Sequence, residues 1–183
     1  MRVILDVNQV KDFILMNREE FYIRDASLVD IVAITEIYNE SILTDVATFD
    51  TEAKSIEDRV NWFNAHDEKH PIIVACVEDK VVGWASLSLW SDRIAYNGTA
   101  EVSVYVDAKY RNMGMGGQLI EELVYQANSN GLHYLLSRIT MGNETSIRLH
   151  KRYGFETIGV MHEVGHKFGV YLDVTLMEKV LEN

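Results

Sequence analysis

The feature that most constrains the fold is a glycine-rich turn at residues 111–117, Arg-Asn-Met-Gly-Met-Gly-Gly, which separates two different hydrophobic patterns. Before it, residues 100–106 alternate along the chain, as expected for a strand with two unlike faces. After it, apolar residues recur at helical spacing until Asn130 and Gly131. A strand, a glycine-rich turn and a helix in this order are typical of an α/β domain. Consecutive N–H groups at such a helix start favour a bound anion.

The patterns along the remaining chain predict a complete α/β (α+β) domain. Strands are expected at residues 21–25, 72–77, 81–89, 100–106, 132–139, 155–160 and 170–177. Helices are expected from residue 27, from residue 55, after the glycine-rich turn and over residues 144–152. We therefore expect a mixed central sheet of about seven strands flanked by about four helices. Residues 20–183 form a single domain in this interpretation, and residues 1–19 an N-terminal extension.

Charge excludes two classes of partner. The formal net charge is −11, whereas proteins that bind nucleic acid or anionic membranes present a basic surface. The first fifteen residues are too short and too charged to span a bilayer, and no small-residue cleavage site follows them. We therefore expect a cytoplasmic protein that binds neither nucleic acid nor membrane.

Cysteine and histidine usage gives no sign of thiol or metal chemistry. Cys76 is the single cysteine and lies in the apolar run Ile72–Val77, so we expect a buried side chain rather than a nucleophile. Several histidines lack the spacing of a metal site and are interpreted as solvated surface residues, namely His66, His70, His162 and His166. We expect no metal.

The glycine-rich turn fits one phosphate-binding motif better than two others. It is not G-x-G-x-x-G and follows several strands, which excludes a dinucleotide-binding motif of the Rossmann type. No Gly-Lys-Ser/Thr follows, which excludes a Walker loop. It reads R-x-x-G-x-G and resembles the acetyl-CoA signature of the GNAT (GCN5-related N-acetyltransferase) superfamily. Residues 143–155 also resemble the superfamily element N-x-x-S/A-x-x-L-Y/H-x-x-x-G-F.

This resemblance implies the GNAT fold and acetyl-CoA as the cosubstrate. The turn would bind the diphosphate, and the thioester arm would lie along Val104–Val106 like an added strand. The side chain of Asn143 would bind the pantetheine arm, although Asn143 also fits an ordinary helix N-cap and can serve both purposes. The implied cofactor-binding residues are Val104, Tyr105, Val106, Arg111, Asn112, Met113, Gly114, Met115, Gly116, Gly117, Asn143 and Ser146.

Within the superfamily, the sequence is similar to the phosphinothricin and methionine sulfoximine N-acetyltransferase branch from about residue 23 to residue 177. Acetyl transfer requires a neutral amine, a base that accepts its proton and an acid that helps the thiolate to leave. The branch pairs a glutamate with a histidine at the positions of Glu101 and His150. The resemblance therefore implies Glu101 as base and His150 as acid, in direct transfer without an acyl-enzyme. From the residues alone, a solvated strand glutamate and a packed histidine remain open.

The resemblance also implies where a small amino-acid-like substrate would bind. Relatives hold the substrate's carboxylate with basic residues in the loop after the third strand, where Arg93 matches one cation and Ser91 replaces a second. Phe49 would form a wall of the pocket, with core packing as the alternative. The implied substrate-binding residues are Phe49, Trp90, Ser91, Asp92, Arg93, Glu101, Val102 and Ser103.

Two other functions remain open at this point. The chain could acetylate a peptide N-terminus or a polyamine, or it could be an acetyl-CoA-binding sensor without catalysis. The retained Glu101 and His150 argue against a sensor, and the bulky Phe49 and Trp90 argue against an open peptide groove. The resemblance further implies a homodimer, with the two closing strands and residues 167–173 near its interface, and a role in detoxification.

Overall fold

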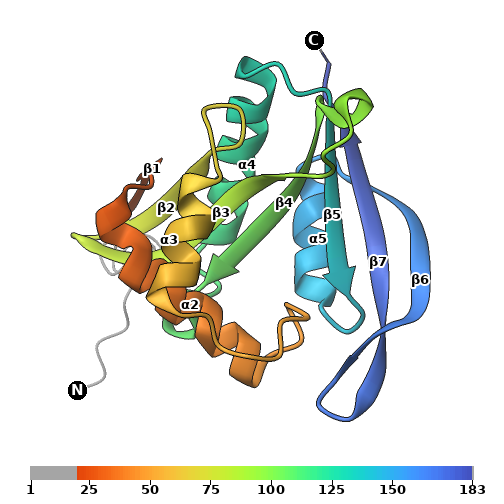
Figure 1. Cartoon of the computed structure of the whole chain (residues 1–183), viewed down its shortest axis with the longest axis horizontal. Helices are drawn as coiled ribbons and strands as arrows, with labels where there is room; N and C mark the ends of the chain where they lie inside the picture. The colour runs from red at the N-terminus through yellow and green to blue at the C-terminus, as the bar shows by residue number, and fades with distance from the viewer. Residues whose placement is uncertain (1–19, 183) are drawn as a thin grey trace, which may run out of the picture.

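The computed structural model describes residues 20–182, so the predicted extension at residues 1–19 lies outside the described residues. Seven strands form one mixed sheet in the order β1-β2-β3-β4-β5-β7-β6 (Figure 1). The strands are β1 (Phe21–Asp25), β2 (Ile72–Val77), β3 (Lys80–Leu89), β4 (Thr99–Val106), β5 (Tyr134–Thr140), β6 (Glu156–Lys167) and β7 (Val170–Val180). The described α-helices are α2 (Ile31–Thr44), α3 (Ile56–Asn64), α4 (Met115–Ser129) and α5 (Glu144–Arg152). The predicted α/β architecture and element order are confirmed.

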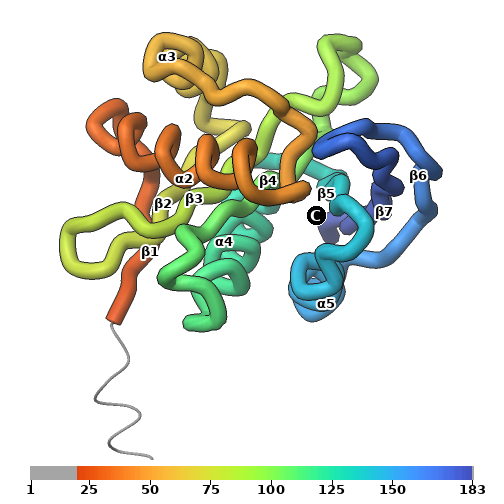
Figure 2. Tube along the Cα trace, turned by 90° about the horizontal axis from the view of Figure 1, so that it is seen from below, coloured from red at the N-terminus to blue at the C-terminus, as the bar shows by residue number. Residues whose placement is uncertain are grey.

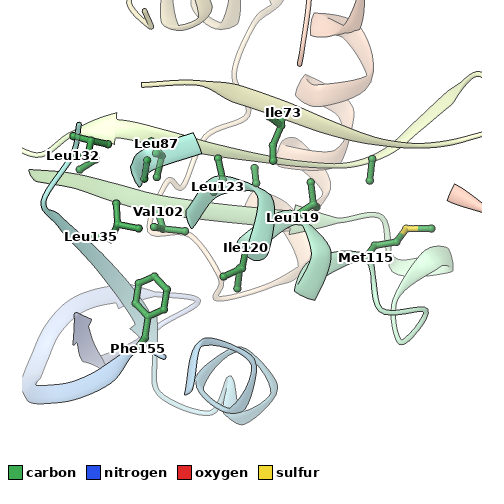
Figure 3. Close-up of a cluster of buried hydrophobic side chains, with 14 of the residues drawn as sticks. Ile73, Leu87, Val102, Met115, Leu119, Ile120, Leu123, Leu132, Leu135 and Phe155 are labelled. Atoms are coloured by element: carbon green, nitrogen blue, oxygen red, sulfur yellow. The ribbon is translucent and has the colours of Figure 1, made fainter. Parts of the chain in front are cut away.

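Helices cover both faces of the sheet. Figure 2 shows α2 and α3 on one side of the strands and α4 and α5 on the other. Under α2 and α3, Ile34 and Ile37 pack with Trp84 of β3. Under α4, the apolar stripe that includes Leu119 and Leu123 packs on β2, β3 and β4 in the larger cluster drawn in Figure 3. The strands between the two layers are therefore buried on both faces, which explains the unbroken apolar run of β2.

Local signals account for most element boundaries. Ser55 and Asp58 form the expected capping box at the start of α3, and α4 ends at the predicted Asn130. The last two strands are longer than predicted. β6 continues to Lys167 through two register shifts against β7, and irregularities of this kind break the polar–apolar alternation that a sequence pattern relies on.

Strands β4 and β5 pair for only part of their length. They run parallel and are paired from Thr99 opposite Tyr134 to Glu101 opposite Leu136. Beyond these residues β4 continues to Val106, paired with β3, and β5 continues to Thr140, paired with β7, but the two strands no longer pair with each other and spread apart (Figure 1). This divergence opens the interior of the sheet directly after Glu101.

Candidate active site

The glycine-rich turn presents free backbone donors at the start of α4. Residues Asn112 and Gly114 have positive φ values of 65° and 91°. No residue in the described range 20–182 accepts a hydrogen bond from the backbone N–H groups of Asn112–Gly116, whereas the N–H of Gly117 bonds to the Gly114 carbonyl at 3.0 Å. The first turn of a helix also carries a partial positive charge. Five successive unpaired donors at this point fit a diphosphate.

The three glycines of the turn serve different purposes. Gly114 needs its positive φ, and a Cβ there would point into open space. At Gly117, a Cβ would lie 2.6 Å from the Tyr153 hydroxyl, so this glycine allows α4 to pack against the end of α5. At Gly116 a Cβ would be less crowded than at Gly117, since it would lie 3.2 Å from the Leu149 side chain. Gly114 thus shapes the candidate anion site, while Gly117 mainly serves helix packing.

Three side chains of the turn contact other parts of the protein, whereas the backbone N–H groups of Asn112–Gly116 have no partner in the described part of the chain. The Nε of Arg111 donates to the carbonyl of Val106 at 3.1 Å, and this exposed side chain approaches Asp45. Met115 is only 1% exposed and belongs to the hydrophobic core, so it can offer a ligand its N–H group alone. Met113 packs at the edge of the same core.

A cavity of about 490 Å³ occupies the opening between β4 and β5. It is lined by nine of the predicted site residues, which are Phe49, Glu101, Val102, Ser103, Val104, Tyr105, Asn143, Ser146 and His150. The other lining residues were not predicted, and among them are Ser88, Ser137 and Arg138. The hydroxyl of Ser137 is buried without a partner among the described residues. The cavity lies along β4, and the glycine-rich turn follows the end of that strand.

Asn143 and Ser146 position the first turn of α5 beside the cavity. The Asn143 side-chain oxygen accepts the Ser146 N–H at 3.1 Å, which confirms the expected N-cap. Its side-chain N–H₂ donates to no residue within 20–182 and stays available to a ligand. Asn143 can therefore hold the helix and a bound molecule at once.

His150 is held in one orientation. Its side chain is 4% exposed, and Nδ1 lies 2.9 Å from the carbonyl oxygen of Ser146. A carbonyl oxygen can only accept, so we assign the hydrogen to Nδ1, and in the neutral ring Nε2 carries the lone pair. Burial lowers the pKa of His150 below its ordinary value, and the bond to Ser146 acts in the opposite direction. The resting imidazole is therefore neutral at physiological pH.

Glu101 forms an ion pair that the sequence analysis missed. Arg138 donates from Nε and Nη2 to its two carboxylate oxygens at 2.6 and 2.8 Å. The Glu101 side chain is 19% exposed and that of Arg138 51%. One sequence signal was present, because Arg138 is the single charged residue in the strand sequence Tyr-Leu-Leu-Ser-Arg-Ile-Thr.

Phe49 belongs to a wall that the β6–β7 hairpin holds in place. Its ring occupies the space that a Cβ at Gly165 would take, with Cζ 2.6 Å from that position. The Nζ of Lys167 donates to the carbonyls of Asp45 and Thr48 at 2.8 and 2.7 Å. These contacts fasten the loop between α2 and α3 to the hairpin.

The loop after β3 does not supply the cavity with a cation. Trp90, Ser91, Asp92 and Arg93 are absent from the residues that line it, and the Arg93 side chain is exposed. Ser91 accepts the backbone N–H of Arg93 at 3.3 Å, a local turn contact. Trp90 contacts the cavity's Arg138, with its ring centroid 5.8 Å from the guanidinium carbon. The structure thus separates the predicted carboxylate receptor from the other predicted substrate residues.

Two of the four histidines that were predicted to be solvated are wholly or partly buried. His162 and His166 are exposed as expected, but His70 is buried and bonds to Asp67 at 2.8 Å, while His66 is half-buried and bonds to the Trp62 carbonyl. Their short polar segment folds back onto the sheet, which composition did not reveal. Within residues 20–182 no cluster of side chains suits a metal ion. Cys76 is fully buried, as predicted.

None of the helices in the described part of the chain is long and apolar enough to cross a membrane.

Comparisons with known proteins agree with this geometry. The model of the acetyltransferase (GNAT) family matches residues 32–155. The L-methionine sulfoximine/L-methionine sulfone acetyltransferase of Pseudomonas paraeruginosa is 39% identical over 87% of this chain and 94% of that protein. The phosphinothricin N-acetyltransferase of Streptomyces coelicolor is 33% identical over 88% and 97%.

A solved structure agrees with the expected cosubstrate. The Salmonella typhimurium protein yncA, solved with its cofactor acetyl-CoA, superimposes with a TM-score of 0.86 at 34% identity, over 88% of this chain and 94% of that one. The unpaired amides of Asn112–Gly116 suit the diphosphate of that cofactor. On its sequence and fold, the chain belongs to the acetyltransferase (GNAT) family.

Proposed function

We propose that this protein transfers the acetyl group of acetyl-CoA directly to the α-amino group of a small amino-acid-like substrate. Candidates are methionine sulfoximine, methionine sulfone and phosphinothricin, the molecules in the names of the relatives. One observation carries the proposal: β4 runs from a cavity lined by Glu101 and His150 toward the unpaired amides of Asn112–Gly116. The cavity with its acid–base groups thus lies along β4, and the candidate diphosphate donors follow the end of that strand.

We assign Glu101 and His150 to two successive proton transfers. An α-ammonium group must lose one proton before it can attack and a second once the new C–N bond forms. Glu101 accepts the first proton and releases it to solvent. The second goes to Nε2 of His150, which the bond from Nδ1 to Ser146 leaves unprotonated. His150 then gives this proton to the departing thiolate.

This sequence explains how a neutral histidine can act as the acid. Burial disfavours the charged imidazolium, so His150 does not store a proton at rest. It acquires one during the reaction, and its lowered pKa makes it a ready donor to a thiolate, whose ordinary pKa is about 8.5. The groups are thereby returned to their starting states after each turnover.

A substrate panel tests the function. Purified protein should acetylate L-methionine sulfoximine, L-methionine sulfone or phosphinothricin in a thiol-release assay with acetyl-CoA. A peptide N-terminus and spermidine, assayed in parallel, represent the alternative amine classes. Turnover of the peptide or polyamine alone would refute the proposed substrate class. Binding of acetyl-CoA without turnover of any amine in the panel would favour a sensor.

We also propose a cytoplasmic homodimer that joins through the β6–β7 hairpin. Its tip, Phe168-Gly169, has positive φ at both residues, which suits a tight turn but places a bulky aromatic side chain in solvent. Val170 and Tyr171 beside it are also exposed. Exposed apolar groups of this kind favour an interface. Light scattering of the purified protein would report the mass, and a monomer at micromolar concentration would refute the dimer.

A further inference from the structure

We propose that Arg138 is the receptor for the substrate's carboxylate, and that the substrate takes the place of Glu101 on its guanidinium group. The inference rests on the proposed function and narrows its substrate class to amino acids with a free α-carboxylate. It moves the site of carboxylate recognition from the loop after β3 to strand β5.

Charge within the cavity supports this assignment. Among the described residues that line the cavity, Arg138 is the single cation of fixed charge and Glu101 the single carboxylate. The other nearby cations are committed elsewhere. Lys167 is buried and donates to two backbone carbonyls. Arg59 is 5% exposed and stacks on the ring of Trp62. Neither residue lines the cavity. A substrate anion that enters this cavity therefore meets one fixed positive charge.

Arg138 retains donors for a second partner. A guanidinium has five N–H groups, and the pair with Glu101 uses those on Nε and Nη2. No residue within 20–182 accepts from its Nη1. The side chain is 51% exposed, so a ligand can reach it. The forked geometry suits bidentate binding of a planar carboxylate, and Ser91 leaves the loop after β3 without the second cation expected there.

The ion pair between Glu101 and Arg138 is complementary to an α-amino acid zwitterion. One carbon separates the ammonium and carboxylate groups of such a substrate, and Glu101 and Arg138 lie in direct contact. The carboxylate can bind Arg138 while the ammonium binds Glu101. Both oxygens of Glu101 accept bonds from Arg138 at rest, so this exchange also frees Glu101 to take a proton from the ammonium. An amine without a carboxylate cannot make the exchange.

Calorimetry on the CoA-loaded protein tests the receptor, with L-methionine sulfone and its decarboxylated analogue as the two probes. For Arg138→Gln we expect the Kd of the sulfone to rise about tenfold or more and that of the analogue to change by less than about twofold. Arg138→Lys keeps a charge without the fork and should give a smaller loss. Arg152→Gln, an exposed arginine of α5, is the matched control.

Three results would overturn the inference: an unchanged sulfone Kd in Arg138→Gln, an equal loss for both probes, or no binding of the sulfone to the wild-type protein. A loss in Arg93→Gln that Arg138→Gln does not reproduce would return the receptor to the loop after β3. Because the readout is binding, Arg138-dependent binding without acetylation would refute the proposed function and leave the receptor standing.

The exchange has its own test. N-acetyl-L-methionine sulfone has a carboxylate but no amine, so it must displace Glu101 without compensation. Glu101→Gln should therefore tighten its binding by about threefold, and the gain should vanish in the double variant with Arg138→Gln. Equal affinity in wild-type protein and Glu101→Gln would overturn the exchange.

Discussion

The two proposed sites beside strand β4 are built from different parts of the chain. Beyond its C-terminal end, the proposed diphosphate site consists of backbone N–H groups from one stretch of five residues, Asn112–Gly116. Along the strand itself, the proposed acetylation site consists of side chains from β4, β5, α5 and the loop after α2. A site made of local backbone tolerates almost any side chain that permits the turn. A site made of side chains depends on where distant elements meet.

This difference separates the steps that each site controls. A change at the turn should alter acetyl-CoA affinity and leave amine binding intact. A change in the cavity should alter turnover or amine binding and leave acetyl-CoA affinity intact. Variants that break this separation would show that the two sites act as one unit.

The largest effect is expected at His150. His150→Ala should lower kcat by about 10²- to 10⁴-fold, because the proton of the new amide and the departing sulfur both lose their partner. The Kd of acetyl-CoA should stay within about threefold. Steady-state kinetics and calorimetry measure the two quantities. His162→Ala removes an exposed histidine of β6 and serves as the control.

The role of His150 in proton transfer also predicts how kcat/KM changes with pH. Burial lowers the pKa of His150, so Nε2 keeps its lone pair as the pH falls to the ordinary value of about 6.5 and loses it only below. The kcat/KM of the wild-type protein should therefore show an acid limb below pH 6.5 that His150→Gln lacks. An identical acid limb in that variant would remove His150 from proton transfer.

The contrast between the two sites also explains what the sequence could predict. The turn was identified because its spacing is local, and α3 and α4 because their caps, Ser55 with Asp58 and Asn130, lie within a few residues of the helix they delimit. The Glu101–Arg138 pair was missed because its members are 37 residues apart and meet only through the register of β4 and β5. No local pattern records that register.

The loop after β3 shows that a resemblance in sequence also cannot predict where a loop lies. Arg93 was assigned to the substrate by resemblance, yet its side chain is exposed and does not line the cavity. Resemblance transfers the position of a residue along the chain but not the path of a loop in space. Glu101, His150 and Phe49 do line the cavity, and each of them belongs to, or is fastened to, a regular element.

A smaller effect is expected at the turn. At φ 91°, Gly114→Val would strain the backbone by about 1–3 kcal/mol and turn some of the five amides away, so the Kd of acetyl-CoA should rise about tenfold to a hundredfold. The KM of the amine should change little. Gly131→Val is a matched control, because Gly131 follows the other end of α4 with a φ of 73°. If both variants weaken acetyl-CoA binding equally, helix stability rather than amide direction is the cause.

The smallest effect is expected at Gly165, where backbone conformation plays no part. A Cβ there would collide with the ring of Phe49, so Gly165→Ala should displace this wall and raise the KM of the amine about threefold to tenfold. The Kd of acetyl-CoA should not change, since the proposed diphosphate site lies beyond the C-terminal end of β4. Gly159→Ala adds the same methyl group to the same strand with no atom within 4 Å. Steady-state kinetics with the best amine of the panel compare the two. Equal KM values would mean that Phe49 packs on the hairpin without touching the substrate, and the wall would then begin elsewhere in the cavity.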